Sequence, residues 1–483
     1  MRKRRTLRFG RAGEHGVLRD IDPMHGVLNH WTWSEQAAFR GGHVVPGDTL
    51  KPYARFMAIK AASVVPFWPH LGQFPDLLVM ADDGIYHVSQ GVVRVAHAYE
   101  ASEVGGHVRG LVYRGVPMIH HAVMGLMYWD IEGALLRPMP GLEGFRAGLI
   151  RPFKSYLIAI GYQGNPYRVA WSDAAVLGGI PQDWRFMGLD SQAGVNHLWE
   201  GDDPIVDARA LNDTCFIYKQ NSTWSMSLTG DALVFAFRKR FAFGALNDRS
   251  VACFENAHYV MTRDDIMVHE GERARSLLKG RLKRWLSENV DVSPARMKEH
   301  MIAADDGSVL ACYPANQSWR EAGFKTIGLS YRPGDKTFGV FTSRSPITWI
   351  DSSYWPNLSK AQCLLIRNGE LFTREAGAAQ AFTLRREDLF LSEPGTPCRL
   401  KVLRLHTRGD ADIHLSLKPR RSERLCGEGA ARGVQYGLKA NRFNPASLSI
   451  EISALSFDLV LKFSNVSEDF ALVDIDFIVQ TYH

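Results

Sequence analysis

The chain has 483 residues, of which 46% are hydrophobic and 22% are charged, so it is long enough for two or more globular domains. This composition excludes a disordered or fibrous chain, and a formal net charge of +6 is too small to indicate a nucleic-acid binder by itself. No apolar run has the length of a membrane-spanning helix, so we expect no membrane span.

Residues 1–60 are rich in Gly, His and Pro and only weakly periodic. We expect them to form an N-terminal arm with peripheral strands. The arm begins with the basic run MRKRRTLRFGR, and two further basic runs follow later, KGRLKRW at residues 279–285 and KPRRSER at residues 418–424. Such runs usually form a solvated surface, and contact with an acidic partner is the alternative.

Between residues 61 and 395, short apolar segments alternate with polar, Gly-rich turns. β-branched and aromatic residues flank each turn, which is the signature of a β-hairpin. Hairpins are predicted in this way at residues 75–91, 110–133, 155–173, 207–230, 250–271, 301–313, 325–342 and 363–377.

The spacing of these turns indicates a repeat. Positions that align with Gly84 follow in steps of 41, 39, 58, 43 and 42 residues, at Gly125, Gly164, Ser222, Asp265 and Gly307. A four-stranded antiparallel blade with short loops needs about 40 residues, so this period predicts a β-propeller over residues 61–395. The long step contains residues 176–203, which we interpret as a loop insertion. An assembly of two-sheet sandwiches is the main alternative.

Residues 271–290 have the pattern of an amphipathic helix. Its apolar face is formed by Leu278, Leu282, Trp285 and Leu286. Its basic residues, which lie largely elsewhere, are Lys279, Arg281, Lys283 and Arg284. A Ser-Pro pair then starts a second short helix at residues 293–301, so we expect a helical excursion over residues 271–301.

The last part of the chain, residues 396–483, has a different character. Apolar and polar residues alternate at residues 398–420 and 446–480, and a Gly/Arg-rich loop at residues 422–445 lies between them. Alternation with a period of two predicts half-buried strands. We therefore expect a separate antiparallel β domain, attached to the propeller as a platform.

Three Asp-Asp pairs raise the question of the carboxylate chemistry that glycoside hydrolases use. The pairs are Asp82-Asp83, Asp264-Asp265 and Asp305-Asp306. Each pair lies at a turn between two apolar segments, where Asp side chains accept hydrogen bonds from nearby backbone. We therefore expect these aspartates to hold turns.

The sequence contains no motif for a catalytic, metal or cofactor site. It has no Gly-rich phosphate-binding loop, no HExxH and no GxSxG, and its six cysteines are too far apart for a zinc site or a disulfide framework. We expect no enzyme activity, no metal and no cofactor, and mostly buried, reduced thiols. Residues 168–184 do not match the Asp-box turn of sialidase propellers, and no local pattern indicates an arginine triad.

Two groups of residues have both a packing and a binding interpretation. His120-His121 lies on an apolar strand, where a core or interface role is favoured over metal binding. Two aromatic pairs could stack on sugars, but packing between blades explains them equally well. These pairs are Trp31 with Trp33 and Tyr128 with Trp129.

Residues 166–286 carry a series of motifs in a defined order. The series is PYRVAWSD (166–173), DW (183–184), GDDPIVDARALNDTCFIYKQNSTWSMSLTG (201–230), FAFGALNDRSV (241–251), HYVMTRDDIMVHEG (258–271) and KGRLKRWL (279–286). This order resembles the tail nozzle proteins of short-tailed bacteriophages, also called tail-stabilisation or tail tubular proteins. The long N-terminal arm and the basic loop at residues 422–445 depart from the family pattern.

The resemblance implies a β-propeller with an attached β platform, and a homo-oligomeric ring, typically of six copies, below the portal and adaptor rings. Such a ring continues and gates the channel through which double-stranded DNA leaves the capsid, and it docks fibres, spikes or a needle. The implied protein is a structural component of the virion tail, assembled in the host cytoplasm. A small net charge suits a conduit through which DNA passes without tight binding.

Two other functions fit the same fold. A propeller that binds or hydrolyses glycans would need convergent carboxylates, or an arginine cluster, at the centre of one propeller face. A tail-hub adaptor would share the structural role but differ in position. For the nozzle hypothesis, the candidate contacts with the channel or with partners are the basic residues Arg2, Lys3, Arg4, Arg5, Lys279, Arg281, Lys283, Arg284, Arg420 and Arg421.

Overall fold

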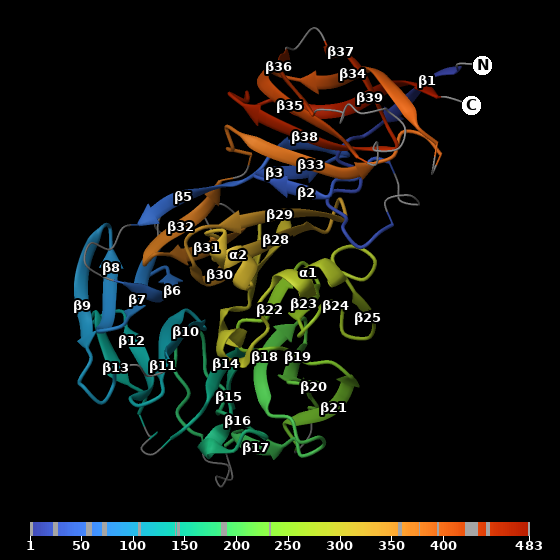
Figure 1. The fold of residues 1–483 in the computed structure, drawn as a ribbon. Helices are drawn as coiled ribbons and strands as arrows, with labels where there is room; N and C mark the ends of the chain where they lie inside the picture. The colour runs from blue at the N-terminus through green and yellow to red at the C-terminus, as the bar shows by residue number, and fades with distance from the viewer. Residues whose placement is uncertain are drawn as a thin grey trace.

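The computed structural model describes most of the chain. The described residues are 3–22, 28–54, 60–69, 75–104, 108–140, 142, 145–184, 191–230, 233–355, 360–375, 377–393, 396–420, 433–440 and 445–481. They form a mainly β structure with two parts, which we call the seven-sheet body and the two-sheet body (Figure 1).

The seven-sheet body consists of four-stranded antiparallel sheets, numbered here 1 to 7 in chain order, and each of sheets 1 to 6 is built from four consecutive strands. Sheets 1 and 2 contain β6 (Ala61–Phe67), β7 (Asp76–Ala81), β8 (Gly84–Ser89), β9 (Val92–Ala98), β10 (Val108–Tyr113), β11 (Val116–His121), β12 (Gly125–Asp130) and β13 (Leu135–Pro138). Sheets 3 and 4 contain β14 (Leu149–Phe153), β15 (Tyr156–Ile160), β16 (Arg168–Trp171), β17 (Gly194–His197), β18 (Ile205–Leu211), β19 (Thr214–Lys219), β20 (Thr223–Leu228) and β21 (Phe235–Phe241). Sheets 5 and 6 contain β22 (Val251–Phe254), β23 (Ala257–Met261), β24 (Ile266–His269), β25 (Ala274–Ser276), β26 (Met301–Asp305), β27 (Ser308–Pro314), β28 (Thr326–Arg332) and β29 (Thr337–Ser343).

Hydrophobicity falls from the inner to the outer strands of these sheets. The second strands, such as β15 and β23, are buried along their whole length, and their sequences YLIAI and AHYVM are nearly continuous apolar runs. The fourth strands, such as β9 and β13, are mostly exposed. Each sheet therefore buries its inner strands between its two neighbours and leaves one edge in solvent.

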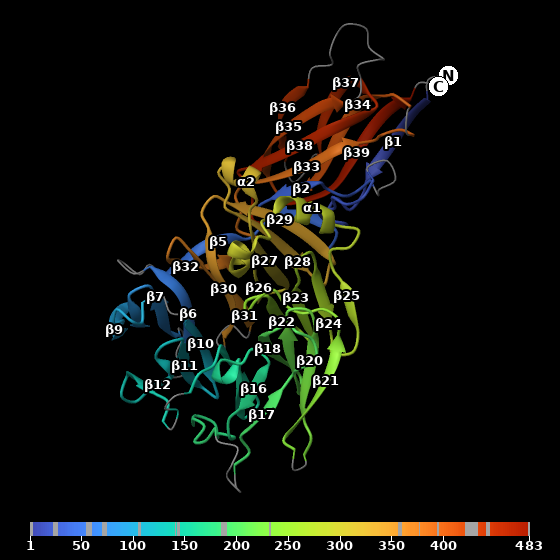
Figure 2. The ribbon, with the colours of Figure 1, turned by 60° about the horizontal axis from the view of Figure 1, so that its bottom comes forward.

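Neighbouring sheets contact each other through their first strands. β6 contacts β10, β10 contacts β14, and the series continues through β18, β22 and β26 to β30 (Ile347–Trp355). β30 in turn contacts β6, so these contacts form a closed cycle, visible from two directions in Figures 1 and 2.

Sheet 7 is closed by a strand from the N-terminal part of the chain. It contains β30, β31 (Lys360–Arg367), β32 (Glu370–Glu375) and β5 (Thr49–Ala54). β5 pairs antiparallel with β32, and Arg374 lies opposite Leu50. The two ends of the seven-sheet body are thus joined by backbone hydrogen bonds.

A buried arginine reinforces this closure. Arg374 of β32 forms ion pairs with Asp48, just before β5, at 2.6 Å and with Asp305 of sheet 6 at 2.8 Å. Burial by itself lowers the pKa of Arg374, but the charges of Asp305 and Asp48 outweigh burial and raise it. Asp305 also accepts a hydrogen bond from the backbone N–H of Cys363 at 3.0 Å. One guanidinium therefore joins the N-terminal strand, sheet 6 and sheet 7.

The two-sheet body combines strands from both ends of the chain, and we number its sheets 8 and 9. Sheet 8 contains β1 (Lys3–Phe9), β3 (Ala37–Arg40), β4 (His43–Pro46), β34 (Cys398–Arg408), β37 (Ala446–Ala454) and β39 (Ala471–Thr481). Sheet 9 contains β2 (Trp33–Glu35), β33 (Phe382–Leu389), β35 (Ala411–Arg420), β36 (Val434–Ala440) and β38 (Ser456–Ser464). Their facing residues share one apolar core, which includes Leu403 and Phe477 from sheet 8 and Leu415 and Leu461 from sheet 9.

Two short helices lie where the two bodies meet. They are α1 (Lys283–Asn289) and α2 (Gln317–Glu321); two 3₁₀ turns, η1 (Tyr162–Gly164) and η2 (Pro294–Glu299), lie elsewhere in the seven-sheet body. Trp33 of β2 stacks on Trp319 of α2, with ring centroids 5.5 Å apart, and meets Trp285 of α1 edge-on at 6.0 Å. Asp20 accepts the backbone N–H groups of Arg284 and Trp285 in the first turn of α1, at 2.6 and 3.0 Å. The N-terminal segment thus ties α1 to both bodies.

The expected helix at residues 271–290 is wrong over its first half. Residues 274–276 form β25, which pairs with β24, and Gly280 has a left-handed φ of 70°, which interrupts a helix. Only α1 remains helical. Leu278, Leu282, Trp285 and Leu286 are all buried, as the apolar pattern predicted.

The expected turn series is correct at five positions and wrong at the sixth. Gly84, Gly125, Gly164, Ser222 and Asp265 all lie at or beside the connection between the second and third strands of their sheets. Gly307 instead joins the first and second strands of sheet 6, where the equivalent connection holds α2. The segment 176–203, expected to be a loop insertion, contains the fourth strand of sheet 3, β17.

Strands also lie across the expected domain limits. β5, within the expected arm 1–60, completes sheet 7, and β33, within the expected propeller range 61–395, pairs with β38 in sheet 9. The expected platform 396–483 supplies β34 to β39, and the arm supplies β1 to β4 to the same two sheets. Among the described residues, no helix is long and apolar enough to cross a membrane.

Because Arg374 is buried, removing one of its carboxylate partners should destabilise the folded protein. Replacing Asp305 with Asn leaves Arg374 with one buried carboxylate fewer, which should cost about 3 kcal/mol of unfolding free energy. Urea denaturation measures this change. The control is Asp82→Asn, because Asp82 is an exposed member of a similar Asp-Asp pair and should change stability by less than about 0.5 kcal/mol. Equal midpoints for the two variants would show that Arg374 does not depend on Asp305.

Candidate functional site

Two predicted contact residues lie on β1, at one side of sheet 8. Arg4 and Arg5 are exposed, and pairing of β1 with β39 places them opposite Gln480 and Val479. Lys3 is the first residue of β1, but its side chain is not described. Arg2 lies outside the described residues.

Two residues of the second basic run are held by contacts within the chain. Arg281 donates from Nη1 to the carbonyl oxygen of Lys336 at 2.6 Å. Lys283 forms ion pairs with Asp264 at 2.9 Å and Asp265 at 3.2 Å. The hydrogen bond to Asp264, more than the other contacts, raises the pKa of Lys283. Both side chains therefore have a structural role in positioning the start of α1.

The other two residues of that run are freely accessible. Lys279 is exposed, and the Arg284 side chain is 77% exposed, with only a long 3.9 Å contact to Glu288 one helical turn away. Exposed ion pairs of this kind contribute little to stability. Lys279 and Arg284 are thus the members of the run best suited to contact a partner.

Arg420 lies at the end of β35, in sheet 9. It forms ion pairs with Asp458 at 2.5 Å and Asp388 at 3.5 Å, and the hydrogen bond to Asp458 raises its pKa. Arg421 and most of the loop at residues 422–445 lie outside the described residues. The eight predicted contact residues that the structure describes therefore belong to three separate places, sheet 8, the segment before and in α1, and sheet 9.

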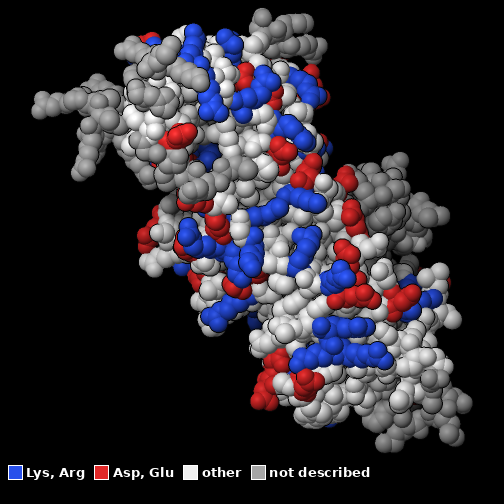
Figure 3. Space-filling model, turned by 90° about the vertical axis from the view of Figure 1, so that its right-hand side faces the viewer, with Lys and Arg blue, Asp and Glu red and all other residues white. Residues whose placement is uncertain are grey.

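Additional basic residues lie on outer strands that the sequence analysis did not select. On the side that carries β1, α1, β21 and β25, Lys and Arg side chains are spread over both bodies, with acidic residues among them (Figure 3). On this side, the exposed basic residues of the fourth strands include Arg238, Lys239 and Arg240 on β21 and Arg275 on β25. The sequence signal for this basic surface was the run FAFRKRF at residues 235–241. Consecutive cations on an outer strand disfavour pairing with another chain and attract an anionic partner.

The longest motif of the family resemblance, residues 201–230, is held together by a contact between its own residues. Lys219 is fully buried and forms an ion pair with Asp203, near the start of the motif, at 3.2 Å. Its ammonium group also donates to the carbonyl oxygens of Leu198, Glu200 and Gly201 at 2.8–3.2 Å. These residues fix the segment that leads from sheet 3 into sheet 4.

Asp203 is held by the same hairpin through its second carboxylate oxygen. That oxygen accepts the backbone N–H of Asn221 at 2.7 Å. Burial by itself raises the pKa of Asp203, but these hydrogen bonds and the charge of Lys219 outweigh burial and lower it. The start of the motif at residues 201–230 is therefore held against its own hairpin.

The three Asp-Asp pairs hold backbone and side chains in place, as expected. Asp83 accepts a hydrogen bond from the hydroxyl of Tyr86 at 2.9 Å. Asp265 accepts from the backbone of Ile266 at 2.8 Å and from the Ser276 hydroxyl at 2.7 Å, so it connects β24 to β25. Asp305, described above, goes further than expected, because it connects two sheets.

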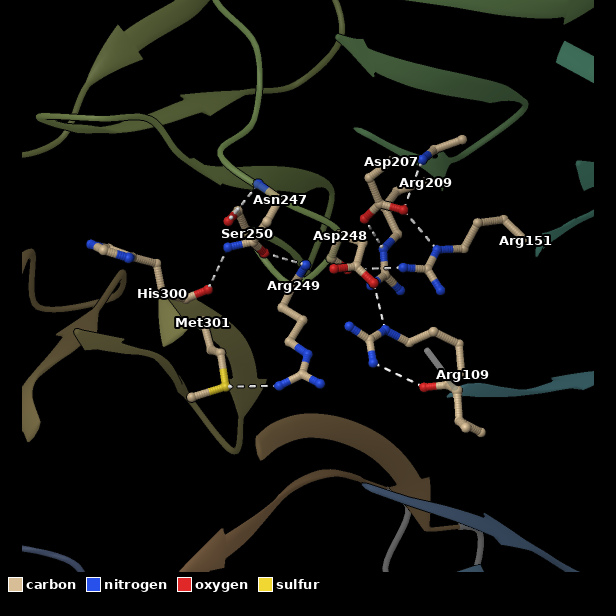
Figure 4. A network of polar contacts seen from close by, with 12 residues as sticks. Arg109, Arg151, Asp207, Arg209, Asn247, Asp248, Arg249, Ser250, His300 and Met301 are labelled. Carbon is tan, nitrogen blue, oxygen red and sulfur yellow. Dashed lines mark hydrogen bonds and ion pairs between the residues drawn. The ribbon is translucent and has the colours of Figure 1, made fainter. Parts of the chain in front are cut away.

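A charged cluster lies where the first strands of the seven-sheet body converge (Figure 4). Asp207 of β18 is fully buried and pairs with two arginines, Arg151 of β14 at 2.7 Å and Arg209 of β18 at 3.1 Å. Arg151 also donates to the carbonyl oxygen of Asp248 at 2.9 Å. Burial, followed by the charge of Arg209, lowers the pKa of Arg151.

Two more arginines complete this cluster. Arg109 of β10 forms an ion pair with the carboxylate of Asp248, in the loop before β22. Arg249, the next residue, donates from Nη1 to the carbonyl oxygen of Thr348 at 3.0 Å and contacts the sulfur of Met301 at 3.8 Å. No local sequence pattern indicated this cluster, because its residues come from four parts of the chain.

A small cavity remains inside the cluster, which we call the axial cavity. Its volume is about 40 Å³, and the four arginines line it together with apolar residues such as Val64 and Trp349 and the carboxylates Asp248 and Asp351. The centre of the seven-sheet body is therefore nearly filled by side chains.

A second polar cluster is buried between sheets 4 and 5. The hydroxyl of Tyr218 lies 2.6 Å from Nδ1 of His258 and 2.7 Å from Nε2 of His269. Nε2–H of His258 donates a hydrogen bond to the carbonyl oxygen of Ala210 at 3.0 Å, so Nδ1 of His258 carries no proton and accepts a hydrogen bond from the Tyr218 hydroxyl. Burial lowers the pKa of His258 to about 4 and that of His269 to about 3. Both rings are therefore neutral in the folded protein near pH 7.

The residues with two interpretations are packed in the interior. His120, His121, Trp31, Trp33 and Trp129 are buried, and Tyr128 is half-buried and packs against an apolar cluster. Nδ1 of His121 accepts the backbone N–H groups of two following residues at 3.1 and 3.2 Å, which is a turn contact. These positions fit packing better than sugar stacking or metal binding.

The described part of the chain also contains possible metal ligands and cysteines. No group of three or more His, Cys, Asp or Glu side chains there is arranged to hold a metal ion. The cysteines there are free, and four of them are buried: Cys215, Cys312, Cys363 and Cys398. Cys253 is exposed, and Cys426 lies outside the described residues.

The chain was compared with known proteins by sequence and by structure. The sequence matches no family model and no curated protein. The extracellular domain of a hybrid two component system from B. thetaiotaomicron is similar with a TM-score of 0.44 and 9% identity, over 88% of this chain and 63% of that chain. The AfRom2 CNH domain has a TM-score of 0.41 and 9% identity, over 68% of this chain and 98% of its own. At these TM-scores and identities, the similarities carry no argument about function.

The Tyr218–His258–His269 cluster predicts acid-sensitive stability. Both folded-state pKa values lie below the unfolded value of about 6.5, so below pH 6.5 the unfolded chain binds more protons and stability falls. Between pH 7 and pH 4.5 each histidine should cost roughly 2–3 kcal/mol, measured by urea denaturation at both pH values. His269→Phe should recover about half of this loss, because one of the two titrating histidines is removed. A phenylalanine ring suits this position, since Phe216 and Phe241 already contact the His269 ring. An unchanged difference between the two pH values in His269→Phe would contradict this prediction.

Proposed function

We propose that the chain is a structural protein of a bacteriophage tail, one subunit of a nozzle ring that continues and gates the DNA-ejection channel and docks fibres or spikes. The motif series at residues 166–286 carries this proposal. Its motifs fall on β16, β18 to β20, β22 to β24 and α1, so they occupy three consecutive sheets in order. Within the longest motif, residues 201–230, the ion pair between Asp203 and Lys219 holds the start of the motif against its own hairpin.

The proposed fold is a seven-bladed β-propeller with a β platform. Seven four-stranded sheets, the cyclic contacts of their first strands and the closure of sheet 7 by β5 support it. Completion of the last blade by an N-terminal strand is a way to close such a fold and protect its edges. Sheets 8 and 9 form the platform.

The channel proposed for DNA runs between copies of the chain and not through one copy. The axial cavity of about 40 Å³ leaves no space for a duplex inside the seven-sheet body. A channel then requires several subunits around a common axis, and such a ring closes through heterologous interfaces. The side with β1, β21, β25 and α1 is the proposed face toward DNA or the neighbouring ring, because its basic residues are exposed on both bodies (Figure 3).

A glycan-binding or glycan-hydrolysing function is supported by one feature of the structure, the arginine cluster at the centre of the seven-sheet body. Two features oppose it. Asp207 and Asp248 already pair with three of the four arginines. The cavity itself, at about 40 Å³, is also far below the roughly 300–1,000 Å³ of ligand pockets, and the adjoining depression of about 400 Å³ is lined mainly by apolar side chains. The nozzle function is therefore favoured, and a tail-hub adaptor differs from it only in position.

Electron microscopy and mass photometry of the purified protein test whether the chain forms a ring. The expected result is closed rings of uniform copy number, with one copy-to-copy interface repeated around the axis. Monomers that stay single at the highest protein concentration, and in the presence of the portal-side ring, would contradict the proposal.

Charge reversal tests the proposed basic face. The double variant Lys279→Glu and Arg284→Glu should lower the yield of infectious particles roughly tenfold or more, because it places negative charge beside DNA phosphates. The matched control is Lys60→Glu with Arg94→Glu, which makes the same charge change at exposed residues near and on sheet 1. Equal titres for the two double variants would remove the segment at residues 279–284 from the channel face. Counting rings in both preparations separates an assembly defect from an ejection defect.

A further inference from the structure

Among the described residues, the charged groups that line or face the axial cavity carry one positive charge in excess. Four guanidinium groups line it, those of Arg109, Arg151, Arg209 and Arg249, and the carboxylates that face them are Asp207, Asp248 and Asp351. Asp351 is exposed, and its Oδ1 already accepts the backbone N–H of Ser352 at 2.8 Å. The excess charge therefore lies in the inner part of the cluster.

Arg249 is the arginine of the cluster that no described carboxylate contacts directly, although the more distant charges of Asp248 and Asp351 act on it. Within the described part of the chain it forms no ion pair within 4.0 Å, and its partners are the Thr348 carbonyl oxygen and the Met301 sulfur. Burial, followed by the like charge of Arg109, lowers the pKa of Arg249 to about 10. A largely buried guanidinium beside a second cation is costly unless an anion joins them.

The geometry gives such an anion a place. Arg109 and Arg249 line the same cavity, and Figure 4 shows their side chains beside each other in the cluster. The cavity volume of about 40 Å³ exceeds the roughly 10–15 Å³ that one water needs and suits a group of a few heavy atoms. Guanidinium groups bind carboxylates through paired N–H donors.

The cavity is also accessible from the surface. A wider depression of about 400 Å³ adjoins it and shares four lining residues with it, Val64, Gly110, Trp349 and Asp351. The depression is lined mainly by apolar side chains such as Pro66 and Leu111. A carboxylate can therefore enter while the rest of the molecule that carries it stays in the depression.

We propose that the axial cavity is a binding site for one carboxylate group, held between Arg249 and Arg109. The carboxylate can belong to a free small acid or to an acidic side chain of a bound polypeptide. This site does not depend on the nozzle function, because its evidence is the unbalanced charge and the cavity alone.

The direct test measures binding of acetate and of N-acetyl-aspartate amide to the purified protein at constant ionic strength. Equilibrium dialysis with radiolabelled acetate should give one saturable site per chain, and thermal unfolding should shift upward with acetate concentration. Tighter binding of N-acetyl-aspartate amide than of acetate identifies a polypeptide side chain as the source, and the reverse order identifies a small acid. Absence of saturable binding of both compounds, or an equal shift with chloride, would overturn the proposal.

Variants separate this site from general attraction of anions. Arg249→Gln should weaken acetate binding roughly tenfold or more. The control Arg238→Gln removes an exposed arginine from β21 and should leave acetate binding unchanged. Equal binding by both variants would overturn the proposal. If Arg249→Gln does not fold, Arg249→Lys keeps the charge but loses the paired donors, and it should bind acetate more weakly than the wild type.

Discussion

The seven-sheet body depends on its closure by β5, and one buried guanidinium reinforces that closure. Arg374 joins Asp48, beside the N-terminal strand β5, to Asp305, at the end of the first strand of sheet 6. Without that strand sheet 7 has three strands, and a row of unpaired backbone groups on β32 faces solvent. The same N-terminal segment then supplies β1 to β4 to the two-sheet body, so closure of one body fixes the position of the other.

A closed cycle of sheets brings charged side chains together at its centre, and their pairing decides what that centre can do. Asp207 and Asp248 pair with Arg109, Arg151 and Arg209, so the first strands are joined by ion pairs as well as by apolar packing. Buried ion pairs of this kind fix geometry more than they add stability. The axial cavity is too small for a DNA duplex, so the proposed DNA path does not run through one copy. The same cavity has space for a small anion beside Arg249, which no described carboxylate contacts directly.

The sequence predicts local structure well and distant contacts poorly. The hairpins and five of the six turn positions follow from apolar flanks and turn residues, which act within a few residues. Gly307 was misplaced because residues 303–310 (AADDGSVL) have the same turn residues as residues 81–88 (ADDGIYHV). The turn at Gly307, however, joins the first and second strands of its sheet and not the second and third. The helix over residues 271–290 was too long because pairing of β25 with β24 and the left-handed Gly280 override the apolar period.

The candidate site was only partly visible for the same reason. Basic runs drew attention to Arg281 and Lys283, which the structure places in internal contacts, while the RKR run on β21 was missed. The axial arginines carry no local signal, since Arg109 and Arg249 are far apart in the chain and meet only when the cycle closes. Closure by β5 is equally non-local, because it pairs residues near 50 with residues near 374.

The most direct measurement of the proposed function is a cryo-electron microscopy reconstruction of the tail of the phage particle. The proposal predicts several copies of this chain in one closed ring at the distal end of the channel, with the side that carries β21, β25 and α1 facing the lumen or the adjacent ring. A tail from which the chain is absent, or a particle in which it occurs as a single copy away from the channel, would contradict it.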